Sequence, residues 1–214
     1  MSTTINGRNC KIEVALTYAT AVAITGVTKA DPAVATKSAH GITAGTVGYF
    51  SVPAGMVELD QQAVLVASPT ANDFTLAGLD ARDYSTFTGG DFIAAATWGL
   101  LDESAGYSVG GGAADQLDDS RLHMAKKVNV TGMLPAEDIT ITLKAPEVEG
   151  AALQQIVKQA RRGLPVLIKI SKGGRVLRVA YGVPSTYGED VQAGALGSGS
   201  LSLSCPAYVL KPNV

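Results

Sequence analysis

The chain has 214 residues, which is enough for one large domain or two small ones. Apolar residues make up 46% and charged residues only 17%, a composition that excludes an intrinsically disordered chain. The net charge of −2 is too balanced for a protein that binds nucleic acid by neutralising phosphates, and two cysteines exclude a disulfide scaffold or a four-cysteine zinc site. So few charges predict a surface that is buried against partners.

No secretory signal and no membrane span are expected. The first ten residues lack the apolar run of a signal peptide, so we expect a reducing compartment and two free thiols, Cys10 and Cys205. The longest charge-free run, from Val191 to Leu210, is interrupted by glycines and Pro206. Its apolar residues alternate, which indicates a strand.

Period-two alternation of apolar residues recurs along the chain and predicts half-buried strands. The first strand is expected at Lys11–Tyr18, with Ile12, Val14, Leu16 and Tyr18 on one face. Further strands are expected at 138–143, 166–170, 175–181 and 201–205. Lys172-Gly-Gly-Arg175 predicts a hairpin turn between two of them.

Residues 24–91 are predicted to form a separate unit. Short apolar runs alternate there with turn signals such as Asp31-Pro32, Pro53-Ala-Gly55 and Gly89-Gly90, which is typical of a small β-barrel. The flanking runs, 11–23 and 92–101, are then expected to be neighbours in a main sheet. The barrel is interpreted as an insertion at a hairpin tip.

The segment between Leu101 and Lys127 shows little periodicity. A loop this long inside a compact domain is either functional or disordered until something binds it, and both alternatives stay open.

One amphipathic helix is expected over residues 147–162. Leu153, Ile156, Val157 and Ala160 have helical spacing, and Gly163 is suited to end the helix. Glu147 and Glu149 are expected to favour its N-terminal dipole, and Arg161 and Arg162 its C-terminal one. Its apolar stripe is expected to pack on a sheet.

Two parts of the sequence resemble known families. The order of short segments in the insert resembles a small β-barrel that recurs in tailed-phage virion proteins. These segments are Ile24–Pro32, Ser38-Ala-His-Gly41, Gly45, Gly55-Met56, Glu58-Leu59, Phe74-Thr-Leu76 and Gly89-Gly90. The rest, residues 1–23 and 92–214, resembles siphophage tail tube proteins in its N-terminal strands, long loop, single helix on a sheet and C-terminal strand.

The resemblance implies a mechanical function. Proteins of that family form hexameric rings whose inner strands join into a continuous β-barrel, and the rings stack into a hollow tube that conducts DNA. The family's helix sits outside the sheet, its long loop reaches a neighbouring ring or subunit, and inserted barrels decorate the virion. The expected partners are further copies of the chain, other tail proteins and double-stranded DNA passing without specific binding. The expected location is the virion, after synthesis in the bacterial host cytoplasm.

The residues with catalytic or metal-binding chemistry do not form a convincing site. His40 has no obvious acid or nucleophile partner and is interpreted as part of a turn, and His123 as a contact to another subunit. Asp115, Asp118 and Asp119 lack the glycine and glutamate of a calcium loop. They are interpreted as a solvated acidic stretch or as a match to a basic patch on the next ring.

Other features also receive structural interpretations. The glycine clusters at 110–112 and 194–199 lack the lysine and hydroxyl residue of a phosphate loop. Trp98 is interpreted as a core or interface anchor.

The expected protein is therefore mainly β, with one helix and an inserted barrel. We expect no catalytic, cofactor-binding or metal-binding residues, and a virion structural role in place of an enzymatic one. Two alternatives remain open. One is another phage tail component, such as a terminator or a minor tail protein, and the other is a β-sheet surface-binding module, for which an aromatic content of 6% is low.

Overall fold

The computed structural model describes residues 9–111, 114, 116–119, 126, 129–132, 136–146, 148–192 and 196–212. Within these residues the chain is mainly β with one α-helix, as the sequence predicts. No helix in these ranges is long and apolar enough to cross a membrane.

The elements follow one another along the chain with short connections. The first half contains β1 (Cys10–Tyr18), β2 (Val22–Ile24), β3 (Gly26–Val27), β4 (Val34–Thr36), β5 (Val47–Ser51), the 3₁₀ turn η1 (Val57–Leu59), β6 (Ala63–Ala67), β7 (Asp73–Leu76) and β8 (Gly90–Leu100). The second half contains β9 (Ser104–Gly110), β10 (Gln116–Asp118), β11 (Asn129–Thr131), β12 (Glu137–Lys144), α1 (Ala151–Arg162), β13 (Val166–Lys172), β14 (Arg175–Asp190) and β15 (Ser198–Cys205).

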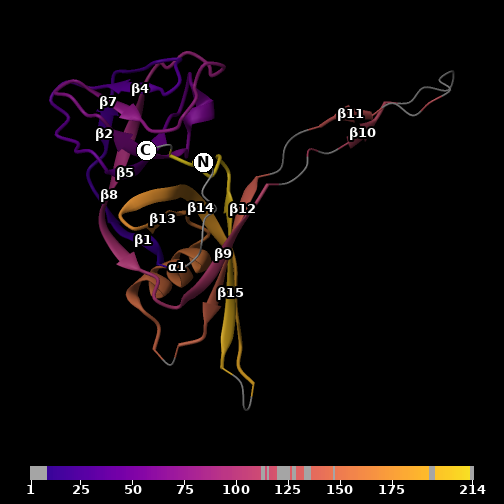
Figure 1. The fold of residues 1–214 in the computed structure, drawn as a ribbon. Coiled ribbons are helices and arrows are strands. Elements are labelled where there is room, and N and C mark those ends of the chain that lie inside the picture. Colours follow the sequence, from indigo (N-terminus) through magenta and orange to yellow (C-terminus); the bar gives the residue numbers. More distant parts are fainter. Residues whose placement is uncertain are drawn as a thin grey trace.

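One large antiparallel sheet runs through the molecule and curls into a half-barrel (Figure 1). Its strand order is β3-β4-β7-β6-β5-β8-β1-β13-β14-β15-β12-β9, and β2 pairs with β8 beside this path. The strands flanking the insert, β1 and β8, are paired as the sequence predicts. The ribbon β10–β11 forms a separate two-stranded sheet that projects away from the body (Figure 1).

The first strand serves two cores because it is irregular. Ile12 and Val14 belong to the core beneath α1, whereas Ala15 belongs to the core of the insert and Tyr18 packs against that same core. Register shifts between Ala15 and Tyr18 change which face the later side chains occupy. The prediction that Ile12, Val14, Leu16 and Tyr18 share one face is therefore wrong beyond Val14.

The helix is shorter at its start than the sequence predicts. It begins after Gly150, whose backbone N–H donates a 2.8 Å hydrogen bond to Oε1 of Glu103. The carboxylate at the helix N-terminus thus comes from a residue distant in sequence, and not from Glu149. Glu147 lies outside the described residues. Gly163 ends the helix with φ of 63°, as expected.

The β13–β14 hairpin confirms the predicted turn, with Gly173 and Gly174 at positive φ between paired Lys172 and Arg175. The strand after this turn continues well past its predicted end at 181. The predicted loop 101–127 is also wrong for 104–110, which form β9 against β12.

The core of the insert continues into the body. Its buried cluster joins Phe50, Phe74 and Phe92 of β5, β7 and β8 to Leu167 and Val179 of β13 and β14. Packing that crosses the predicted boundaries at 23/24 and 91/92 means that insert and body stabilise each other. The two-domain division itself stays a prediction.

The C-terminal segment fastens insert and body together. Backbone bonds join Leu210 and Val179 in both directions at 3.0 Å, and Leu210 is part of the insert's core cluster. Nε2 of the buried Gln62, on the insert, donates a 3.0 Å bond to the carbonyl of Tyr208. Residues 208–210 therefore act as a strap across the junction.

Three tyrosines complete the junction. Tyr49 of β5 stacks on Tyr181 of β14 with ring centroids 4.0 Å apart, and Tyr18 of β1 meets Tyr49 edge-on at 5.6 Å. The Leu167 N–H donates a 3.2 Å bond to the Tyr18 hydroxyl oxygen, and burial raises the pKa of Tyr18 to about 12.

Shortening the strap should weaken the fold. Leu210→Ala is expected to lower the free energy of unfolding by about 2 kcal/mol, because it leaves a cavity in a shared core. Tyr208→Ala, at a side chain that is 58% exposed, should change it by less than about 0.5 kcal/mol. Urea unfolding measures both, and equal losses would contradict the strap.

The Tyr18 contribution should depend on pH. Folding favours the neutral phenol, so this stabilisation is complete below pH 10, the ordinary pKa, and is lost as the pH rises toward about 12. Tyr18→Phe should be less stable than the parent chain near neutral pH by about 1 kcal/mol, since the Leu167 N–H loses its acceptor. Urea unfolding from pH 8 to pH 12 should show this difference shrinking, and a constant difference would contradict the assignment.

Candidate functional site

Four strands of the large sheet form a layer with a distinctive outer face. The layer consists of the second half of β14 (183–190), β15, β12 and β9, which pair in that order. One face carries Ile139, Ile141, Leu201 and Leu203, which are buried in the core beneath α1. The opposite face is turned away from that core.

The outer face is built from small residues in rows that cross the strands. One row joins Gly106, Thr142, Ser200 and Gly188. The next row joins Ser108, Thr140 and Ser202. We call this surface the hydroxyl face. Every residue in the two rows is exposed or half-buried, so the face is flat and wet.

The hydroxyl face carries few charges. Register places Asp138, Lys144 and Asp190 on it, each exposed, which gives two carboxylates and one ammonium group. Within the described residues this layer therefore presents no cluster of cations of the kind that grips a phosphate backbone. Small hydroxyl side chains line it instead.

Both borders of this layer are open in the part of the chain that the structure describes. β9 ends the strand order and pairs only with β12. Beyond Gly182, where its pairing with β13 ends, β14 pairs only with β15. Pro184 stands at the start of this half, and a proline is tolerated where one side of a strand is unpaired. The two open edges have similar lengths and opposite strand directions.

His40 occupies a turn, as the sequence predicts. Its Nδ1 accepts a 3.0 Å bond from the Ile42 N–H, and its Nε2 lies 3.3 Å from the carbonyl of Asp73. Its ring meets Phe74 edge-on at 5.1 Å. Both nitrogens are thus held by backbone groups, and the ring is oriented by the core.

The predicted acidic stretch lies only partly within the described residues. Asp118 ends β10 and Asp119 follows it, both exposed on the projecting ribbon. Asp115 and His123 lie outside the described residues. Of the glycine clusters, Gly110 and Gly111 end β9, and Gly197 and Gly199 lead into β15, while Gly112 and Gly194 are not described.

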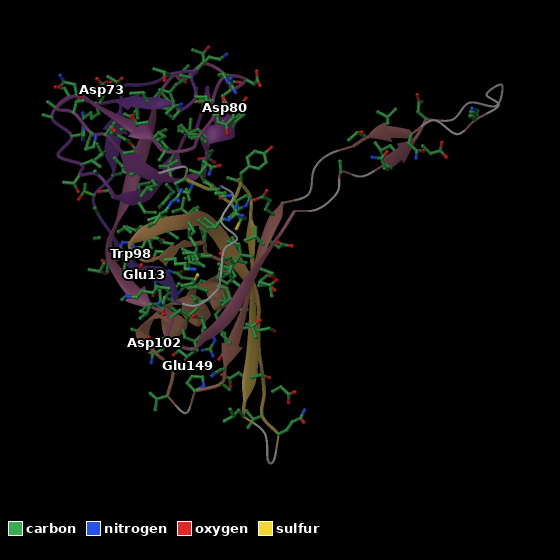
Figure 2. All side chains as sticks on the ribbon, in the orientation of Figure 1. Glu13, Asp73, Asp80, Trp98, Asp102 and Glu149 are labelled. Carbon is green, nitrogen blue, oxygen red and sulfur yellow. The ribbon has the colours of Figure 1, made fainter. Side chains whose placement is uncertain are left out.

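The carboxylates of the described residues do not converge on one place. Figure 2 shows Asp73 and Asp80 on the insert, far from Asp102 and Glu149 near α1. No group of three or more His, Cys, Asp or Glu side chains in the described ranges could hold a metal ion.

Trp98 lies on the body at the border of the insert. It is half-buried against the insert's core, and Nζ of Lys169 lies 4.4 Å from its ring centroid. The same ammonium group is 3.1 Å from Oε2 of Glu13 (Figure 2). These contacts give Trp98 an anchoring role within the chain.

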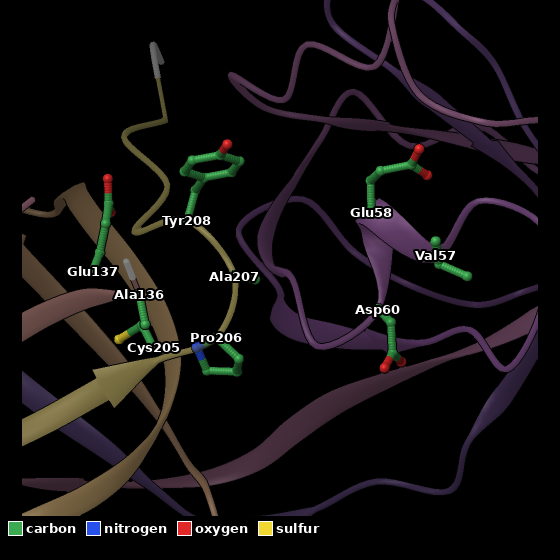
Figure 3. A pocket seen from close by; sticks show the side chains of 9 residues that line it. All are labelled: Val57, Glu58, Asp60, Ala136, Glu137, Cys205, Pro206, Ala207 and Tyr208. Carbon is green, nitrogen blue, oxygen red and sulfur yellow. The ribbon is translucent and has the colours of Figure 1, made fainter. Parts of the chain in front are cut away.

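A cavity of about 350 Å³ lies between η1 and the strap (Figure 3). It is lined by Glu58, Asp60, Glu137 and Tyr208 among others. Each carboxylate already accepts a backbone bond: Glu58 from Ser85, Asp60 from Val52 and Glu137 from Val209. The three acids are therefore tied to the surrounding backbone.

Sequence reasoning missed the open edges. The signal for β9 is present, because Tyr107 and Val109 alternate with small residues and pack on the core. Glycines at 106, 110 and 111 mask this alternation. The extension of β14 past 181 is masked by Pro184 and by the register shift that follows it.

Comparison with known proteins adds no relative. No protein-family model matches the sequence, and no curated protein matches it either.

Proposed function

We propose that this protein is the tube-forming subunit of a long phage tail. Copies of the chain assemble into rings, the rings stack into a hollow tube, and the tube conducts DNA in the virion. The observation that supports this most strongly is the pair of open edges on the four-stranded layer.

Edge-to-edge pairing explains why both borders are open. Unpaired N–H and C=O groups on a sheet edge lead to uncontrolled aggregation unless they are paired or protected. If β9 of one copy pairs with the second half of β14 of the next, both edges are used. The contact is head-to-tail, so it generates a closed ring when the rotation between copies returns to the start.

The hydroxyl face then lines the inside of the ring. The helix α1 lies on the opposite side of the layer, toward the outside. A lining of Ser, Thr and Gly with one lysine among two acids has no strong affinity for a polyanion, so DNA passes without being held. The low charge of the whole chain suits subunits that bury large faces permanently.

The direct experiment is negative-stain electron microscopy of the purified chain over a concentration series. Uniform hollow tubes are expected. Single rings that never stack would favour the alternative of a terminator or another tail component. Particles that remain monomeric at every concentration would contradict the proposal and favour a surface-binding module.

A charge-pair experiment tests the edge pairing itself. Gly106 and Gly188 belong to the same row and face the two open edges, and a side chain added at either meets nothing within 4 Å. In a ring these positions become neighbours of adjacent copies, where like charges oppose pairing. The double variant G106K/G188K should raise the critical concentration for assembly about tenfold.

Two matched variants complete this test. G106K/G188E should assemble nearly as well as the parent chain, because the two new charges attract. Thr142→Lys adds the same charge to the same row on the central strand β12, and it should leave assembly nearly unchanged. Sedimentation and microscopy measure all three variants. Normal assembly of G106K/G188K would show that these edges do not meet.

A further inference from the structure

We propose that the β10–β11 ribbon of one copy docks into an apolar groove on a second copy. The groove lies between β6, the loop before β5 and the β13–β14 turn, and we call it the turn groove. This inference rests on the proposed self-assembly and names a donor surface and an acceptor surface for it.

The ribbon has an apolar side with nothing to cover it in the described structure. Leu117 and Val130 stand directly opposite each other in its two strands. They are 59% and 49% exposed. An isolated two-stranded ribbon is marginally stable in water, because it has no core of its own. A surface that covers this pair would stabilise the ribbon.

The ribbon does not reach its own turn groove. It projects away from the body, whereas β6 and the β13–β14 turn belong to the insert and the body (Figure 1). The chain from Gly110 to Leu117 can span about 23 Å when extended. This reach is enough to carry Leu117 well beyond the edge of its own sheet and onto a neighbouring copy.

The turn groove has the matching chemistry. It is a cavity of about 550 Å³ lined mainly by apolar groups, including those of Leu65, Val66, Ala67 and Val176. Its size falls within the range of about 300–1,000 Å³ that is typical of ligand pockets. It is large enough for more than one aliphatic side chain.

Charge favours this acceptor and sets the orientation. Arg175 is exposed on the wall of the turn groove, at the end of the Gly173-Gly174 turn. On the ribbon, Asp119 is exposed two residues after Leu117. With Leu117 in the groove, its carboxylate lies within reach of the guanidinium group. Such a pair adds orientation and specificity to an apolar contact.

Cross-linking between two single-cysteine variants tests the contact. Both are made in a Cys10→Ser background, which removes the half-buried native thiol, while Cys205 is buried. One copy carries Leu117→Cys, and the other carries Ala67→Cys and a size tag. A short bismaleimide should give a covalent heterodimer in the mixture.

A matched control uses the other exposed apolar hairpin. Leu196→Cys, at a side chain that is 88% exposed, replaces Leu117→Cys in the same mixture. It should give no heterodimer above the background from random collision. Equal yields from the two donors would overturn the proposal.

Charge reversal provides a second readout. Asp119→Arg on the donor or Arg175→Asp on the acceptor should each lower the heterodimer yield about fivefold, because each leaves like charges facing. Combining them should restore the yield to within about twofold. Failure of the combined variants to recover would exclude the Asp119–Arg175 contact and with it the proposed orientation.

The outcomes separate this inference from the proposed function. Tubes that form without any cross-linked heterodimer from the Leu117→Cys and Ala67→Cys mixture would overturn the docking and leave the tube intact. A specific heterodimer from a protein that never forms rings or tubes would support the docking and refute the tube.

Discussion

The backbone of a sheet edge is the constraint on which the rest of this structure depends. The sheet curls far enough to enclose one face against α1, yet it does not close on itself within the described residues. A closed barrel would have satisfied every N–H and C=O internally. Here the second half of β14 and the whole of β9 keep one side unpaired. The proposed ring follows from this incompleteness, because the simplest partner for an open edge is the opposite edge of another copy.

The insert is held by shared packing. Its three phenylalanines lie in the same buried cluster as Leu167, Val179 and Leu210, and the tyrosine stack crosses the same junction. Such continuity fixes the position of the insert relative to the sheet. Whatever the insert contacts on the outside of an assembly is therefore coupled mechanically to the layer that forms the ring.

The regular parts of the fold could be predicted from sequence because their physics is local. Ile139, Ile141 and Leu143 alternate strictly, and the stripe of Leu153 and Ile156 with Gly163 defines the helix end. The helix start could not be predicted, because its cap is Glu103, whose position depends on how β9 follows β8. The hydroxyl face also escaped prediction. Ser200 and Thr142 become one surface only through cross-strand register, which no local pattern reports.

The number of strands in the layer has a consequence of its own. Each of β14, β15, β12 and β9 runs opposite to its neighbour, and four is an even number. A chain of copies joined edge to edge therefore keeps strict alternation of direction through every junction, whatever the size of the assembly. An odd number would force one parallel seam per copy. Strand polarity thus places no restriction on how many copies close a ring, and the size is left to the twist and curvature of each layer.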